Sequence, residues 1–155
     1  MIIKLTNDQS TKQREYYNEL VTLLASNHPD WYVLDVGVGD CWDYSKLWKN
    51  YTSIDRNDKA TVKGDICDCS LPNEAYDLIL CNGMYEYVDM VGNMISEVWR
   101  MLKPYGLAVF GFVGPDYKYD GISTRRYHGE ELFDCFRNRN KHWIDKTYCY
   151  ITAKK

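Results

Sequence analysis

Residues 33–42, VLDVGVGDCW, are the stretch from which the fold can be argued. An apolar run leads into an acid and is followed by Gly37 and Gly39, as at the end of a buried parallel strand. The glycines permit a sharp turn and let a ligand approach main-chain N–H groups closely. Residues 42–51 then predict a helix. Although Gly-x-Gly alone is a weak signal, strand, turn and helix together indicate where a doubly wound α/β sheet receives a nucleotide-like ligand.

Length and composition are those of an ordinary globular protein. The 155 residues suit one domain, so we expect a single unit over residues 1–155. The net charge of −3 argues against a broad surface for nucleic acid, although Arg125 and Arg126 leave a local basic patch open. No apolar run approaches the roughly 20 residues of a membrane span.

The N-terminal residues and the cysteines predict a cytoplasmic location. The first ten residues turn polar after three apolar ones, which is not typical of a signal peptide. Without such a signal, the six cysteines are expected to be reduced thiols. Cys67 and Cys69 lack the spacing and the nearby histidine of a zinc site, so no metal is expected.

Apolar and β-branched runs predict the strands of the sheet. The expected strands cover residues 31–35, 52–55, 60–63, 76–81 and 107–113, with one or two more in 143–153. The second and third lie too close together for a parallel crossover, which takes about a dozen residues or more. We therefore expect a Rossmann-like, doubly wound α/β fold with a mainly parallel sheet of about six or seven strands, in which the helix between strands two and three is reduced.

Three further segments predict helices. Apolar residues from Tyr17 to Leu24 recur at helical spacing, which favours a helix that packs on the sheet over one that covers a ligand cleft. Apolar residues also step by three and four over residues 88–102, and residues 130–136 predict a short helix.

Asp55 ends the second expected strand and has two interpretations. An acid at this place can accept two hydrogen bonds from a ribose diol. The same carboxylate can instead cap the turn in the sequence DRND, residues 55–58.

Five motifs carry a resemblance to a known family. In order along the chain they are LDVGVGD, SID, GDICD, YDLILCNGMYEYV and EVWRMLKPYG. This series resembles class I S-adenosylmethionine-dependent methyltransferases, and most of all the small-molecule and glycan-modifying group known as methyltransferase type 11. The resemblance covers residues 31–112, and a weaker similarity continues through STRRYHGEELFDCF.

The resemblance implies S-adenosylmethionine as cofactor and a role for several strand ends. Asp35 would organise the glycine loop and reach the cofactor amino group through water. The methionine part and the methyl-bearing sulfur would lie against Gly37, Val38, Gly39, Asn82 and Gly83.

The adenosine part would be held by the next two segments. The resemblance implies that Asp55 binds the ribose hydroxyls and that Arg56 lies along the adenine edge. Asp65 would accept the exocyclic N–H of adenine, and the main-chain N–H of Ile66 would donate to a ring nitrogen.

The sequence also departs from the family pattern. Cys41 replaces the third glycine of the loop, and Glu86-Tyr87-Val88 stands where the family has Glu-His-Val. These departures leave open a non-catalytic relative that keeps the cofactor fold.

The chemistry of methyl transfer gives only weak support to any catalytic residue. Alignment of acceptor, methyl carbon and sulfur with water excluded supplies much of the rate, and a base is needed only for a hydroxyl or protonated amine. His128 has the most suitable unperturbed pKa, but it is equally explained as the entry to the helix at 130–136. Glu86 is the other candidate, although an acid there also suits the start of a helix. The catalytic residue is therefore left unknown.

Tyrosine-rich segments follow strands four and five, where the loops of an α/β sheet build the ligand site. The candidates for acceptor contact are Tyr85, Tyr117, Arg125 and Arg126, although the arginines are also explained as solvated surface charges. Aromatic faces with a few acids favour a small-molecule or saccharide acceptor, and neither a membrane nor a long nucleic acid is expected as a partner.

Two rival enzyme classes fit less well. A nicotinamide-dependent oxidoreductase needs a third glycine where the chain has Trp42. Residues 81–84, CNGM, stand where N-directed nucleic-acid methyltransferases carry Asn/Asp-Pro-Pro-Tyr. We therefore predict S-adenosylmethionine-dependent methyl transfer to a small molecule or saccharide. An RNA methyltransferase and a non-catalytic cofactor-binding module remain the alternatives, and the oligomeric state is left undetermined.

Overall fold

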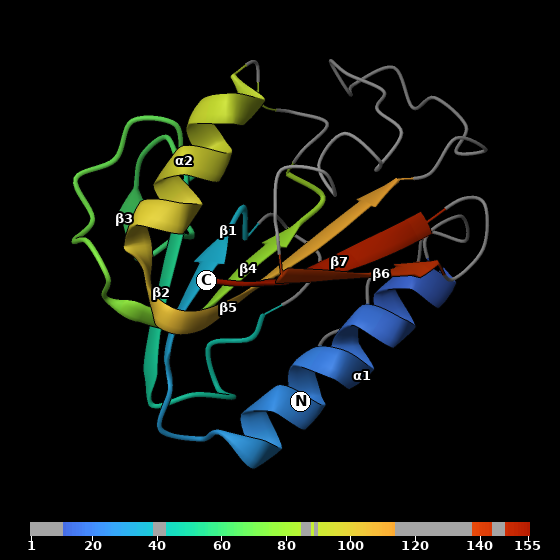
Figure 1. Ribbon diagram of the computed structural model, residues 1–155. Helices are drawn as coiled ribbons and strands as arrows, with labels where there is room; N and C mark the ends of the chain where they lie inside the picture. The colour runs from blue at the N-terminus through green and yellow to red at the C-terminus, as the bar shows by residue number, and fades with distance from the viewer. Residues whose placement is uncertain (1–10, 39–42, 85–87, 89, 114–137, 144–147) are drawn as a thin grey trace.

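The computed structural model describes residues 11–38, 43–84, 88, 90–113, 138–143 and 148–155 (Figure 1). Within these residues, seven strands form one sheet in the order β3-β2-β1-β4-β5-β7-β6. The strands are β1 (Tyr32–Val36), β2 (Asn50–Asp55), β3 (Val62–Lys63), β4 (Tyr76–Asn82), β5 (Leu102–Val113), β6 (Asn138–Trp143) and β7 (Tyr148–Lys154). The helices of this part of the chain are α1 (Thr11–Asn27) and α2 (Val91–Met101).

The sheet is mainly parallel, as the sequence predicts. Strand β1 pairs in parallel with both β2 and β4, and the parallel ladder extends to β3 on one side and β5 on the other. Strand β7 is antiparallel to both β5 and β6. The chain leaves β1 toward β2 and later returns on the other side of β1 as β4. This reversal is the switch point at which doubly wound sheets bind ligands.

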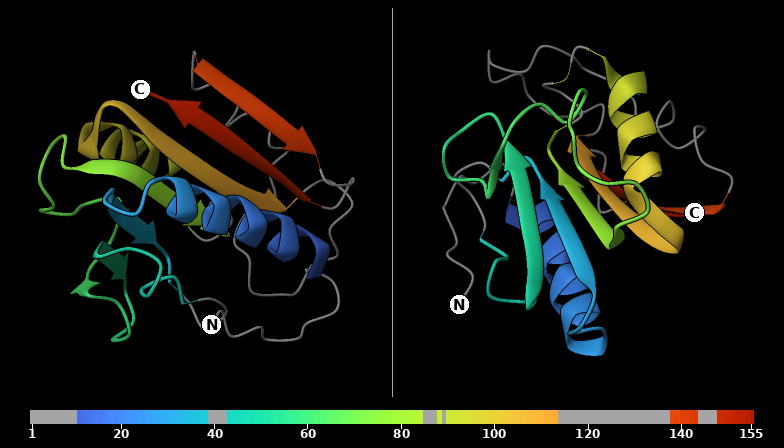
Figure 2. Two further views of the ribbon diagram at one scale, coloured as in Figure 1. Left: turned by 90° about the horizontal axis from the view of Figure 1, so that it is seen from below. Right: turned by 90° about the vertical axis from the view of Figure 1, so that its left-hand side faces the viewer.

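The two helices cover opposite faces of the sheet (Figures 1 and 2). On the α1 face, Tyr17 and Val21 are buried in one cluster with Val33, Leu78 and Leu80. The α2 face has its own cluster, which contains the buried side chains Leu34, Ile79, Met94, Val98 and Met101. Each such side chain contributes about 1.5–3 kcal/mol by burial, so these clusters hold both helices on the sheet. The interpretation of α1 as a packing helix is confirmed.

The helix expected over residues 42–51 is wrong for the part that the structure describes. Residues 45–47 form a turn and β2 begins at Asn50. The Asp43 side chain accepts the Ser45 N–H at 2.9 Å, a local bond that competes with helix formation. Tyr44 and Trp48 are nevertheless buried on the α1 face. A turn between them therefore buries the two aromatic side chains whose spacing predicted a helix.

The connection between β2 and β3 contains turns and bends and no helix, which confirms the expected reduction. Strand β3 is shorter than the predicted 60–63. Thr61 donates its main-chain N–H to the Ser53 hydroxyl at 2.9 Å, and the two hydroxyls lie 3.1 Å apart. A side chain thus takes the place of a ladder bond before β3 begins.

The remaining expected elements have different outcomes. The helix and strand expected over 88–102 and 107–113 are found as α2 and β5, and β7 lies within the expected 143–153. Strand β6 lies almost wholly before that range, because its polar sequence NRNKHW lacks the alternation of a half-buried strand. It is the last strand in the sheet order, where charged side chains are common. The helix expected at 130–136 lies outside the described residues.

Candidate functional site

Three neighbouring strands, β1, β2 and β4, bring their carboxyl ends to one edge of the sheet. Val36 of β1 is in register with Ile54 of β2 and with Cys81 of β4. The residues that follow these positions, Gly37, Asp55 and Asn82, therefore lie at the same level of the sheet. The structure brings these predicted site residues together, at the switch point where a ligand is expected.

Gly37 makes the closest approach of main chain and side chain at this edge. Its φ is +77°, a conformation that favours glycine, and its N–H donates to the Ile54 carbonyl at 2.9 Å. A Cβ added to Gly37 would lie 2.0 Å from the Met84 sulfur, so no side chain fits there while Met84 keeps its place. Gly83 also has a positive φ, +70°, and its N–H donates to the Gly111 carbonyl at 2.8 Å, which fixes the end of β4 to β5.

Asp35 is a buried carboxyl group directly before the glycine turn. Its side chain is on the α1 face, and the Tyr51 hydroxyl donates to it at 2.7 Å. Burial raises the pKa of Asp35 to about 7, although the hydrogen bond from Tyr51 acts in the opposite direction. Burial and the neighbouring Asp35 in turn raise the pKa of Tyr51. The pair therefore holds one proton on Tyr51, and Asp35 is poised to change charge near neutral pH.

Asp55 caps the turn that follows β2. Its Oδ1 accepts the Asn57 N–H at 3.0 Å, which confirms the turn-capping interpretation. Its main-chain carbonyl accepts the Gly64 N–H at 2.8 Å, so the end of β2 is also attached to the segment after β3. The role of Asp55 toward a ribose stays a prediction.

Asp65 faces Arg56 across this edge, and the two form an ion pair in which the side chains are 36% and 70% exposed. Its Oδ1 also accepts the Cys67 N–H at 2.8 Å. These interactions hold the pKa of Asp65 below its usual range, the bond from Cys67 first and the bond from Arg56 next, so the group is a carboxylate at neutral pH. Ile66 is buried beside it and anchors the segment to the α2-face core.

Val38 is half-buried directly after Gly37. The other predicted site residues lie outside the described residues. They are Gly39, Tyr85, Glu86, Tyr117, Arg125, Arg126 and His128.

Sequence reasoning missed two residues of this edge, Tyr51 and Met84. The sequence places Tyr51 in the expected helix 42–51, and its contact with Asp35 arises only from the pairing of β1 with β2. Met84 belongs to the segment CNGM, which carries no signal for a contact with Gly37. No spacing signal could have found either residue, because one contact joins two strands and the other joins the segments that follow two strands.

The described ranges contain no group of three or more histidine, cysteine, aspartate or glutamate side chains that could hold a metal ion. In the same ranges, no helix has the length and apolar character needed to cross a membrane. The polar groups at the strand ends are carboxylates and main-chain groups. The carboxylates accept hydrogen bonds, which suits an organic ligand with hydroxyl and amino donors. The strand order and the mainly parallel pairing define a Rossmann-like α/β protein.

Comparison with known proteins narrows this class. Residues 34–110 match the family described as a methyltransferase domain. A curated relative, malonyl-[acyl-carrier protein] O-methyltransferase of Halalkalibacterium halodurans, is 23% identical over 87% of this chain, and the chain spans 60% of its length.

Solved structures share the fold. A methyltransferase dependent on S-adenosylmethionine (SAM) from Archaeoglobus fulgidus superposes with a TM-score of 0.70 at 17% identity, over 94% of this chain and 97% of the other. The 1,6-didemethyltoxoflavin-N1-methyltransferase of Burkholderia thailandensis, solved with 1,6-didemethyltoxoflavin and S-adenosylhomocysteine bound, gives 0.69 at 14% identity, over 99% and 94%.

The chain belongs to the class I S-adenosylmethionine-dependent methyltransferases. This confirms the family that the five sequence motifs resemble, the Rossmann-like fold, the enzyme class and S-adenosylmethionine as the cofactor of that class.

Proposed function

We propose that the chain binds S-adenosylmethionine at the carboxyl edge of β1, β2 and β4 and transfers its methyl group to a small-molecule acceptor. The observation that carries the proposal is the convergence of Gly37, Asp55 and Asn82 at one level of the sheet, with the Asp65 segment attached beside them. These positions are far apart in sequence, and the parallel register alone places them together.

The residues present fit this cofactor chemically. Adenosine offers hydroxyl and amino donors, and Asp55 and Asp65 are carboxylates that accept such donors. The tight turn at Gly37 brings the main chain to the edge of the sheet where the methionine part would bind. Asp35 lies behind this turn, and its carboxyl group would counter the positive charge of an amino group held in front of it.

The part of the protein in the chemistry is orientation and exclusion of water. The cofactor carries an activated methyl group, so a fixed line between acceptor and methyl carbon supplies much of the rate. In the described residues, the Gly37 turn, Met84 and the Asn82–Gly83 end of β4 form the surface against which that alignment would be made. A base from His128 or Glu86 stays a prediction, as do the acceptor contacts Tyr85, Tyr117, Arg125 and Arg126.

A small molecule or saccharide is the acceptor class that we propose. The named relatives have chemically different acceptors, malonyl-[acyl-carrier protein] and 1,6-didemethyltoxoflavin, so they support the reaction more than any one substrate. The acidic balance of the chain disfavours a long nucleic acid. We further propose that residues 1–155 act as one domain in the cytoplasm.

The test is cofactor binding followed by a methyl-transfer screen. Calorimetry with S-adenosylmethionine and S-adenosylhomocysteine should show saturable binding, and labelled S-adenosylmethionine should transfer label to sugars, phenols or small acids. Binding of a nicotinamide dinucleotide in place of both ligands would refute the proposal. Binding without transfer to any acceptor would favour the non-catalytic alternative, and labelling of RNA alone would favour an RNA methyltransferase.

A further inference from the structure

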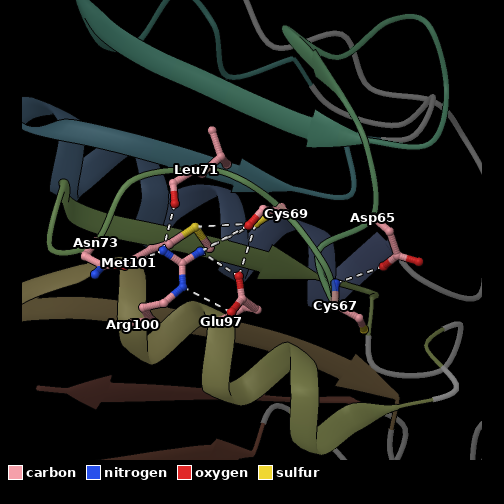
Figure 3. A network of polar contacts seen from close by, with 8 residues as sticks. All are labelled: Asp65, Cys67, Cys69, Leu71, Asn73, Glu97, Arg100 and Met101. Atoms are coloured by element: carbon pink, nitrogen blue, oxygen red, sulfur yellow. Dashed lines mark hydrogen bonds and ion pairs between the residues drawn. The ribbon is translucent and has the colours of Figure 1, made fainter.

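The guanidinium of Arg100, in the last turn of α2, contacts the connection between β3 and β4 (Figure 3). It donates to the Leu71 carbonyl at 2.7 Å, to the Asn73 side-chain oxygen at 2.5 Å and to the Cys69 carbonyl at 3.4 Å. The Arg100 carbonyl accepts the Glu74 N–H at 2.9 Å. Arg100 therefore contacts the segment 69–74 at four of its residues.

Glu97 fixes the orientation of this guanidinium. Its two carboxylate oxygens accept from Nε and Nη2 of Arg100 at 3.0 and 2.6 Å. The pair is partly buried, and the hydrogen bond from Arg100 lowers the pKa of Glu97, which stays ionised. Such a bidentate pair depends on the planar fork of arginine, which lysine cannot reproduce.

The opposite end of the same connection is attached to β2. Gly64 donates to the Asp55 carbonyl at 2.8 Å, and the Asp65 carboxylate pairs with Arg56. Asp65 and the buried Ile66 therefore lie at the end of the connection that is attached next to β2. The other end, residues 69–74, is attached to Arg100. Cys69 Sγ also contacts Glu97 and Met101, and the Ala75 N–H donates to the Met101 carbonyl, but Arg100 supplies the hydrogen bonds to the main-chain carbonyls of Cys69 and Leu71.

We propose that Arg100 is a positioning residue that holds Asp65 and Ile66 in the orientation that receives the adenine of the cofactor. The inference rests on the proposed function, because the adenine role of the segment comes from it. An ordinary surface ion pair contributes little to stability and does not fix the position of a loop. Arg100 differs because it donates to the main-chain carbonyls of Cys69 and Leu71, which lie in the same connection as Asp65 and Ile66.

The test compares Arg100→Ala and Arg100→Lys with the control Lys103→Ala. Lys103 forms a partly buried ion pair with Asp77 at 2.9 Å, away from residues 65–74. Two quantities are measured on the full chain: hydrogen–deuterium exchange of residues 65–74 without ligand, and the dissociation constant of S-adenosylhomocysteine. Thermal unfolding of each variant separates lost stability from lost positioning.

We expect Arg100→Ala to accelerate exchange in residues 65–74 and to weaken S-adenosylhomocysteine binding by about 10- to 100-fold, as displaced binding groups do. Arg100→Lys should show a smaller change of the same kind. It provides the measurement if the alanine variant is too unstable to purify. Lys103→Ala should lower the unfolding temperature without either effect. Unchanged exchange and affinity in both Arg100 variants would overturn the inference.

A double-mutant cycle separates this inference from the proposed function. If Arg100 acts through Asp65, Arg100→Ala should weaken binding less in an Asp65→Asn background than in the wild type. Fully additive losses would overturn the inference and leave the proposed function standing. Failure of the wild-type chain to bind S-adenosylhomocysteine would overturn the proposed function, and the exchange data would then decide whether Arg100 orders the segment.

Discussion

The Tyr51 hydroxyl and the Asp35 carboxyl group share a 2.7 Å hydrogen bond beneath the glycine turn. The two residues are in neighbouring strands, and the bond joins β1 to β2 directly below the expected ligand edge. The chemistry of the site is therefore coupled to the stability of the sheet that carries it.

The stability of the fold should depend on pH through Asp35. Burial raises its pKa from 3.8 to about 7, so the folded protein retains a proton that the unfolded chain releases. This contribution is fully present below about pH 4 and is lost as the pH rises through 7, by about 4 kcal/mol in total. Denaturant unfolding between pH 5 and 8 should show the loss in the wild type and not in Asp35→Asn. Parallel pH profiles for the two proteins would contradict it, and Asp58→Asn, at an exposed site, is the control.

Tyr51→Phe should make the same group still harder to ionise. The hydroxyl stabilises the carboxylate, so its removal should raise the pKa of Asp35 further and cost about 1–3 kcal/mol at pH 8. The cost should shrink toward pH 5, where Asp35 is protonated in the folded state. Carboxyl carbon NMR titration measures the pKa directly, and a downward shift would refute the assignment.

Asp55→Asn should weaken cofactor binding while leaving the turn intact. The amide keeps the oxygen that accepts the Asn57 N–H and removes the charge. We expect a loss of about 1–3 kcal/mol in the binding of S-adenosylhomocysteine, measured by calorimetry. Asn57→Ala, which retains the main-chain donor of the same turn, is the matched control. Equal affinities for wild type and Asp55→Asn would remove Asp55 from the site.

Gly37→Ala should be destabilising for two separable reasons. The new Cβ meets Met84, and the φ of +77° is unfavourable for alanine by about 1–2 kcal/mol. Met84→Ala added to Gly37→Ala should relieve the collision and leave the backbone cost. Thermal unfolding of the two single variants and the double variant tests this. A double variant no more stable than Gly37→Ala would show that Met84 does not limit the space.

Local sequence signals predict the central strands well and long-range contacts poorly. The run YDLILC, residues 76–81, predicts a buried strand, and β4 contains all of it. The spacing of Tyr44 and Trp48 is compatible with either a helix or a turn. The hydrogen bond from the Ser45 N–H to Asp43 favours the turn, which is the structure found. The convergence of Gly37, Asp55 and Asn82 could be anticipated because these residues end or follow expected parallel strands. The partner of Asp35 could not, because strand register decides it.

If the proposed cofactor site is right, the contact between Met84 and Gly37 should make that site sensitive to oxidation of a preparation. The Met84 side chain is half-buried, and its sulfur fills the space that the missing Cβ of Gly37 leaves. Conversion to the sulfoxide adds a polar oxygen to that sulfur. An aged sample would then lose affinity for S-adenosylhomocysteine at unchanged sequence and concentration, and methionine sulfoxide reductase would restore it.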